Sequence, residues 1–226
     1  MKRMIFVWIV SLLLTSAPQM SVATEALRIA SIYAMSGQIG INQRYSVMGV
    51  RCGVESVNRE GGVLGKPIEL IEIDNLGTPI GSKQAAEKSV ALGVTAIIGP
   101  AWSSHALAAA PVAQQAGIPL ITSISTHPSV TEIGDYIFRA CFSDRFAGKA
   151  LAHFARTELK AETAVIAQDL SSSYSTGLAD IFEKQFRREG GRIIDRISYK
   201  QPIENFDKIV DAVVKANADV LFIPGY

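Results

Sequence analysis

The sequence predicts an α/β protein with two doubly wound parallel-sheet lobes, the second of them incomplete. Three observations support this fold class. Predicted strands and helices alternate along nearly the whole chain after residue 26, which is typical of parallel sheets. Predicted helices end at glycines such as Gly61 and Gly190, which adopt left-handed backbone conformations without a Cβ penalty. The short apolar run from Val94 to Gly99 is typical of a strand that is covered on both faces of a parallel sheet.

The first 23 residues are predicted to be a signal peptide rather than part of either lobe. Lys2 and Arg3 form a basic start, and an uncharged apolar run from Met4 to Leu14 follows. Small residues up to Ala23 match what a signal peptidase reads, so we expect cleavage after Ala23. The apolar run is too short to span a bilayer comfortably. An uncleaved membrane anchor is the alternative, and the processed chain would have about 203 residues.

Composition allows one large domain or two small ones and gives no sign of a nucleic-acid partner. Hydrophobic residues make up 48% of the chain, enough for a real core. Without Lys2 and Arg3, the 22 basic and 21 acidic residues become 20 and 21, a net charge of −1 with no block of one sign. Cys52 and Cys141 are interpreted as buried free thiols, and a disulfide between them stays open as the alternative.

The first lobe is predicted over residues 24–143. Its clearest stretch is Asn58 to Asp74, which contains a helix end, a glycine stop, a turn at Gly65–Pro67 and the alternating strand Ile68–Ile73. The helix before it places four valines on one face, as expected of a helix that packs on a sheet. The expected strands are 27–34, 68–73, 94–99, 118–124 and 136–142, and the expected helices are 46–59, 82–92 and 104–116.

The second, partial lobe is predicted over residues 144–226. Leu178, Phe182 and Phe186 recur every four residues and define the buried face of one of its helices. The expected helices are 144–159, 177–189 and 205–216, and the expected strands are 163–168, 192–199 and 218–223.

The candidate binding residues follow strands, because open parallel sheets bind ligands outside the carboxyl ends of their strands. Ser103 and Ser104 come where a strand gives way to a helix, whose first N–H groups and positive dipole end suit a carboxylate. We expect Ser103 to contact the ligand. For Ser104 we favour a helix cap, with a ligand contact as the alternative.

Three further side chains are predicted on the same rim. Thr126 follows the fourth strand, and its hydroxyl could accept from an ammonium group, although it could equally be an ordinary turn residue. Trp102 is expected to form a wall of the pocket, with a structural role as the alternative. Tyr174, in a serine-rich loop, could close over a ligand or pack locally.

The signatures of common enzyme classes are missing. The segment Ser175–Gly177 lacks the glycine that opens a G-x-S-x-G elbow. The loop Gly61–Lys66 is one residue short of a phosphate-binding loop, and Pro67 stands where a serine or threonine is needed. His105, His127 and His153 do not have metal-ligand spacing. We therefore expect no enzyme activity, no cofactor and no metal.

Two remaining pairs are also not read as catalytic. Ser103 and His105 are two residues apart in a predicted helix, so their side chains do not face each other. Asp74 and Asp169 end strands and are expected to form turns rather than an acid–base pair.

These residues resemble the leucine/isoleucine/valine-binding family of periplasmic proteins from bacterial ABC importers. The stretches that carry the resemblance are AMSG from Ala34, VNREGGVLGKPIEL from Val57, IIGPAWSS, LITSISTHP, FRACFSD and AQDLSSSYSTGL. The resemblance implies a Venus-flytrap fold that clamps an amino acid or similar small molecule, and a location in the periplasm. It also implies delivery to a membrane permease by a monomer. A ligand-sensing module of a signalling or amide-sensor system is the alternative.

The resemblance also implies a set of ligand contacts. The Ser103 side chain and nearby backbone N–H groups would hold the ligand carboxylate, and Thr126 with a backbone carbonyl would hold the ammonium group. The implied ligand-binding residues are Ala101, Trp102, Ser103, Ile124, Thr126, Tyr174 and Tyr226.

The sequence departs from the family pattern in several places. Asn42 stands where an aromatic residue often closes the pocket, and Trp102 replaces a smaller residue. Cys52 and Cys141 do not match the local disulfide of some members. Family chains also run well beyond residue 226, and the part without a counterpart here holds an acidic residue that meets the ammonium group.

Overall fold

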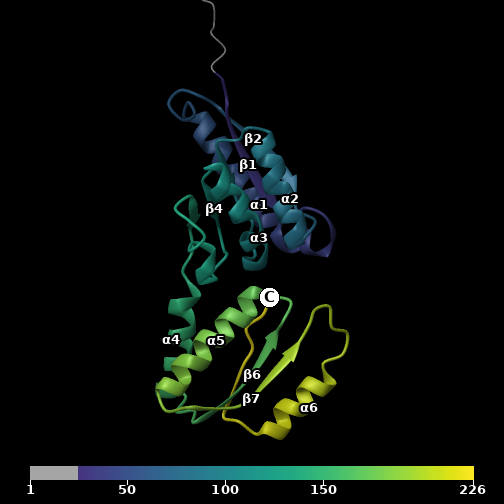
Figure 1. Cartoon of the computed structure of the whole chain (residues 1–226), viewed down its shortest axis with the longest axis vertical. Coiled ribbons are helices and arrows are strands. Elements are labelled where there is room, and N and C mark those ends of the chain that lie inside the picture. The colour runs from purple at the N-terminus through teal and green to yellow at the C-terminus, as the bar shows by residue number, and fades with distance from the viewer. Residues whose placement is uncertain (1–24) are drawn as a thin grey trace, which may run out of the picture.

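The computed structural model describes residues 25–226, and the predicted signal peptide with its cleavage site after Ala23 lies outside this range. The helices and strands form two groups, each around its own sheet, and Figure 1 shows one group above the other. We call them the first and second lobes. Among the described residues no helix is long and apolar enough to cross a membrane.

The first lobe is built on a five-stranded sheet in the order β2-β1-β3-β4-β5, and all of its strands are parallel. In the centre of the sheet, Ile29 lies opposite both Leu70 and Ala96. This order places the carboxyl ends of β3 and β4 side by side at one edge, where the candidate residues follow. The strands are β1 (Leu27–Tyr33), β2 (Ile68–Asp74), β3 (Ala96–Ile98), β4 (Leu120–Thr122) and β5 (Ile137–Arg139).

Helices cover the two faces of this sheet unequally. α2 (Pro79–Ala91) and α3 (Ser103–Ala116) pack against each other and bury one face with many alanines. α1 (Gly37–Arg59) contacts β1 and β2 on the other face. That face is open over β4 and β5, where Ile121 and Phe138 are exposed. The expectation that the strand around Val94–Gly99 is buried on both faces is therefore wrong, since Ile97 is buried but Ile98 is only half-buried.

The second lobe has a three-stranded parallel sheet in the order β7-β6-β8. α4 (Asp144–Thr157) and α5 (Ser173–Arg188) pack against each other, and Phe182 and Phe186 of α5 are buried as their spacing predicted. The Phe182 ring stacks on Phe222 of β8 at a centroid distance of 4.0 Å. The remaining elements are β6 (Thr163–Asp169), β7 (Arg192–Tyr199), α6 (Asp207–Ala216) and β8 (Val220–Phe222).

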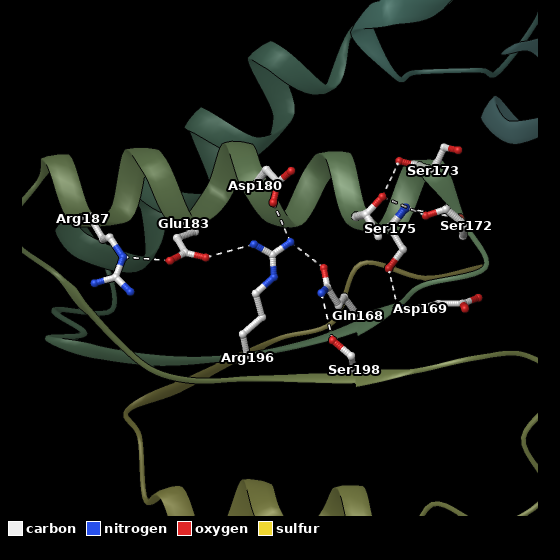
Figure 2. A network of polar contacts seen from close by, with 11 residues as sticks. Gln168, Asp169, Ser172, Ser173, Ser175, Asp180, Glu183, Arg187, Arg196 and Ser198 are labelled. Atoms are coloured by element: carbon white, nitrogen blue, oxygen red, sulfur yellow. Dashed lines mark hydrogen bonds and ion pairs between the residues drawn. The ribbon is translucent and has the colours of Figure 1, made fainter.

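A polar network fixes α5 on this sheet (Figure 2). The Arg196 guanidinium of β7 reaches Asp180 at 2.6 Å and Glu183 at 3.2 Å on α5, and it donates to Gln168 of β6 at 2.5 Å. Closer to the start of α5, the Ser175 hydroxyl accepts from the Asp169 N–H at 2.9 Å and donates to the Pro224 carbonyl at 2.5 Å. Ser175 thereby ties the first turn of α5 to the segment that carries Tyr226.

Several helices begin earlier than the sequence predicted. α1 begins at Gly37 rather than Ser46, and its first turns are held by tertiary contacts: the Gln43 side chain accepts from the Ala34 N–H at 2.9 Å. α2 begins at Pro79 because the Thr78 hydroxyl caps it by accepting from the Gly81 N–H. Other boundaries differ by a few residues, as is usual where helix and strand ends fray.

Candidate functional site

The first turns of α3 and α5 meet where the two lobes come together. The Ser104 hydroxyl of α3 accepts a hydrogen bond from the backbone N–H of Ser173, the first residue of α5, at 2.9 Å. The prediction that Ser104 caps its own helix is wrong, since Trp102 is the N-cap residue and α3 has no side-chain cap. The two helix N-termini, each with free N–H groups and a positive dipole end, lie close together at this point.

Ser103 is fully buried and faces the second lobe. Its backbone N–H donates to the Tyr226 hydroxyl across the lobes at 3.4 Å, near the upper limit for a hydrogen bond. Its side-chain oxygen accepts from the His127 N–H at 3.3 Å, which leaves the hydroxyl hydrogen free to be donated elsewhere. The amide at the start of α3 thus points toward the other lobe, as the interpretation of this turn requires.

An aromatic stack crosses the same space. The Tyr226 ring lies between Trp102 at a centroid distance of 4.7 Å and Tyr174 at 4.9 Å, with interplanar angles of 14° and 29°. Tyr174 belongs to the first turn of α5 and not to a loop, so its predicted location was wrong. This helix start was not predicted because serines make up most of its first residues. The Ser172 hydroxyl caps the helix by accepting from the Ser175 N–H.

The other predicted site residues differ in exposure and in the contacts they make. Thr126 is 7% exposed, and its carbonyl accepts from the Asp144 N–H at 2.9 Å. Ala101 is buried, but its carbonyl already accepts from the Ser125 hydroxyl at 2.8 Å. The Ile124 side chain is half exposed and lines a separate cavity between α1 and the sheet, so only its backbone can serve the site.

That separate cavity has a volume of about 520 Å³, and it is not the interlobe site. Its walls are almost entirely apolar and include Ser46, Gly49 and Gly53 of α1 together with Ile98 of β3. It exists because α1 leaves part of the sheet face uncovered. A ligand pocket needs a few convergent polar groups, and the rim at Ser103 has them.

Asp144 is a site residue that the sequence analysis did not single out. It is the first residue of α4 and fully buried, and neither carboxylate oxygen makes a hydrogen bond of acceptable geometry with any described residue. Burial raises the pKa of this carboxyl, and the nearby Thr126 hydroxyl and Arg139 guanidinium only partly oppose the rise. Burial raises the pKa of the Tyr174 and Tyr226 hydroxyls, and the charge of Asp144 adds to the rise.

Asp144 carries a signal that sequence reasoning could have used. It follows β5 in the way Ser103 follows β3, and an acidic residue in the first turn of a helix usually stays solvated near the helix dipole. A buried carboxylate needs a nearby donor or cation, and the Thr126 hydroxyl and the Arg139 guanidinium are the groups near Asp144.

The histidines and the two turn aspartates play structural parts. Burial lowers the pKa of His105 to about 4, and its ring lies 3.4 Å from the Asn75 side-chain nitrogen. His127 caps a short 3₁₀ turn by accepting from the Ser129 N–H. Asp74 and Asp169 accept from backbone N–H groups of the turns that follow them, as predicted of turn formers. No cluster of metal-ligand side chains occurs between residues 25 and 226.

Both cysteines are free thiols, as the favoured interpretation had it, but Cys52 is exposed on α1 rather than buried. Cys52 is exposed because of its place on the helix. Val50 and Val54 lie on the face of α1 that is turned to the sheet, and Cys52 between them points outward. Cys141 is half-buried, and burial raises the pKa of its thiol.

Two parallel α/β lobes that meet at the first turns of two helices, with aromatic rings stacked between them, are typical of two-lobed periplasmic binding proteins. The chain belongs to the periplasmic binding protein family, whose model matches residues 26–225. This membership confirms the predicted fold and family resemblance.

Individual relatives agree with this assignment. A Leu/Ile/Val-binding protein homolog from Brucella melitensis is 25% identical over 207 residues, which are 91% of this chain and 56% of the relative. A leucine-binding protein from Thermotoga maritima superposes with a TM-score of 0.83 at 32% identity, covering 89% of this chain and 57% of that one. A branched-chain amino-acid transporter substrate-binding protein from Streptococcus pneumoniae, solved with isoleucine, gives a TM-score of 0.79 at 28% identity, with 89% and 57% covered. The chain spans about half the length of these relatives.

Proposed function

We propose that this protein is the periplasmic solute-binding component of an ABC importer and binds a branched-chain amino acid or related small carboxylate between its lobes. In this proposal residues 1–23 direct export and are removed after Ala23, residues 24–143 and 144–226 are the two lobes, and a monomer hands its ligand to a membrane permease. Its relatives support the proposal: one was solved with isoleucine and another is named as a leucine-binding protein.

The single observation that carries the proposal is the Ser103 N–H, which faces across the lobes at the N-terminus of α3. A carboxylate in place of the Tyr226 hydroxyl would accept from this amide and from the Ser103 hydroxyl, and hydrogen bonds to a charged group are roughly twice as strong as neutral ones. We assign the ammonium group of an amino acid to Thr126 and Asp144, which are joined by a hydrogen bond from the Asp144 N–H to the Thr126 carbonyl. Asp144 would then supply, from within this chain, the negative charge that zwitterion binding requires.

Isothermal titration calorimetry with leucine, isoleucine and valine tests the proposal. Ser103→Ala removes one donor to the carboxylate and should weaken binding at least about tenfold, roughly 1.4 kcal/mol. Ser104→Ala is the matched control on the next residue, whose hydroxyl faces Ser173 instead. Unchanged affinity in Ser103→Ala, in a chain that still unfolds cooperatively, would contradict the assignment of this serine.

A further inference from the structure

The His127 side chain lies at the contact between the two lobes. It belongs to the segment that follows β4 in the first lobe, and its ring lies against Gly177 of α5 in the second lobe. A Cβ at residue 177 would lie 2.4 Å from Cδ2 and 2.5 Å from Nε2 of the ring, so the lobes approach this closely only because the residue is glycine. The hydrogen bond between Ser104 and Ser173, one turn earlier on α5, carries no charge. His127 therefore brings to this contact a group whose charge can change near neutral pH.

The hydrogen bonds of His127 require a neutral ring. Nδ1 accepts from the Ser129 N–H at 3.2 Å and so caps the 3₁₀ turn Pro128–Val130. A ring nitrogen that accepts carries no hydrogen, so the hydrogen of the neutral ring is on Nε2 in this arrangement. In the imidazolium both ring nitrogens are donors, and Nδ1 would point its hydrogen at the Ser129 N–H. Protonation therefore removes the hydrogen bond that holds the ring in place against Gly177.

The charges around the ring come from three elements and act in both directions. The Arg139 guanidinium of β5 donates to the His127 carbonyl at 2.9 Å, which places a cation close to the ring. Burial and this cation lower the pKa of His127, and Glu132 from the loop that follows and Asp180 from α5 oppose the decrease. The Asp180 carboxylate already pairs with an arginine of β7. From α3, the neutral Ser103 hydroxyl accepts from the His127 N–H. The contact between the lobes therefore favours the neutral imidazole.

We propose that His127 is a pH-sensitive switch of the lobe contact: the neutral ring allows the lobes to meet, and the imidazolium, which needs water, separates them. Separation exposes the ring to solvent, where it takes up a proton at its ordinary pKa of about 6.5. Because the separated state binds the proton more tightly, acid shifts the equilibrium toward it below about pH 6.5, by up to about tenfold per pH unit. His105 titrates in a different range, since burial lowers its pKa to about 4.

The consequence of the switch for a ligand rests on the proposed function. A ligand that is held by both lobes stabilises only the state in which the lobes meet. Mild acid should therefore weaken its binding and promote its release.

Small-angle X-ray scattering of the purified chain without ligand tests the switch directly. The radius of gyration should increase reversibly as pH falls from about 7.5 to about 5.5. His127→Asn keeps an acceptor for the Ser129 N–H but cannot take up a proton, so it should stay compact at both pH values. His153→Asn, which removes an exposed histidine of α4, is the matched control and should keep the wild-type response.

Proton NMR of the imidazole Cε1–H signals supplies a second measurement of the switch. The signal that is lost in His127→Asn belongs to His127, and its titration midpoint in the wild-type chain should lie below about 6.5. The switch is overturned by a radius of gyration that is the same at both pH values, or by a midpoint that is not lowered. An expansion in acid that His127→Asn keeps, or that His153→Asn loses, would overturn it as well.

Calorimetry with leucine, isoleucine and valine separates this inference from the proposed function. The affinity of the wild-type chain should fall at least about threefold between about pH 7.5 and 5.5, and the fall should be smaller in His127→Asn. An equal fall in both chains would overturn the link between the switch and ligand release. A cooperatively folded chain that binds none of the three amino acids at either pH would overturn the proposed function, and scattering and NMR would still decide the switch.

Discussion

Replacing Asp144 with asparagine should stabilise the unliganded protein while weakening its binding of amino acids. The carboxylate is fully buried, and neither oxygen makes an acceptable hydrogen bond with a described residue. Leaving a buried polar group unpaired costs about 1–3 kcal/mol, and more when the group is charged. The amide has the same shape without the charge, so we expect Asp144→Asn to raise the free energy of unfolding at pH 7 by about 1–3 kcal/mol. For a chain of this length each kcal/mol corresponds to about 2–4 °C in Tm.

The difference in the free energy of unfolding between Asp144→Asn and the wild-type chain, followed against pH, reports on Asp144 alone, because both chains share every other titrating group. Burial raises the folded-state pKa of Asp144 above its ordinary value of 3.8. A raised pKa means that folding favours the protonated form, so its stabilising contribution is present below the unfolded pKa and is lost as pH rises through the folded pKa. The gap in stability between Asp144→Asn and the wild-type chain should therefore be small near pH 3.5 and grow toward neutral pH.

Urea unfolding of both chains across this pH range measures the gap, and calorimetry supplies the second half of the test. Asp144→Asn should lose affinity for leucine but keep that for 4-methylpentanoate, the same molecule without its amino group. The reasoning is refuted if Asp144→Asn is less stable than the wild-type chain at pH 7, or if the stability gap does not change with pH.

Two further predictions concern the same region. Burial depresses the His105 pKa from 6.5 to about 4. The stability that neutral His105 contributes should therefore be full above pH 6.5, and the free energy of unfolding should fall by roughly 3 kcal/mol as pH drops to 4. His105→Asn should flatten this pH dependence in urea unfolding, and an equally steep dependence would contradict the assignment. A Cβ at Gly177 would meet the His127 ring at 2.4 Å, so Gly177→Ala should push the lobes apart, increase the radius of gyration in solution scattering and weaken ligand binding. Adding His127→Asn, which keeps an acceptor for the Ser129 N–H, should restore both, and no restoration would show that the contact does not set the spacing.

Periodicity and glycine stops were enough to predict the two parallel sheets and the rim on which the site lies. The strand within Val94–Gly99 was predicted, and the helix after it was predicted to begin one residue later than Ser103, because these signals are local in the sequence. The start of α5 was missed since Ser172 to Ser175 have low helix propensity, and only the cap and the contact with Ser104 reveal the helix.

Features that depend on contacts between distant segments could not be predicted in this way. Asp144 looks like an ordinary first-turn acid, and only the packing of the start of α4 beside Thr126 removes it from solvent. The position of Tyr226 depends on the Ser175–Pro224 hydrogen bond, which joins residues 49 positions apart. Likewise, Ile98 seemed fully buried from its apolar neighbours, but how much of a sheet face a helix covers is a property of tertiary packing.

The position of Trp102 gives the protein an intrinsic optical reporter. The chain contains two tryptophans, and the other, Trp8, lies in the predicted signal peptide. A processed chain would therefore fluoresce, on excitation at the red edge of indole absorption, from a single emitter stacked on the Tyr226 ring. Exchange of that phenol for any other neighbour would change the emission maximum and quantum yield of Trp102, so stopped-flow fluorimetry could follow occupancy in real time without a label.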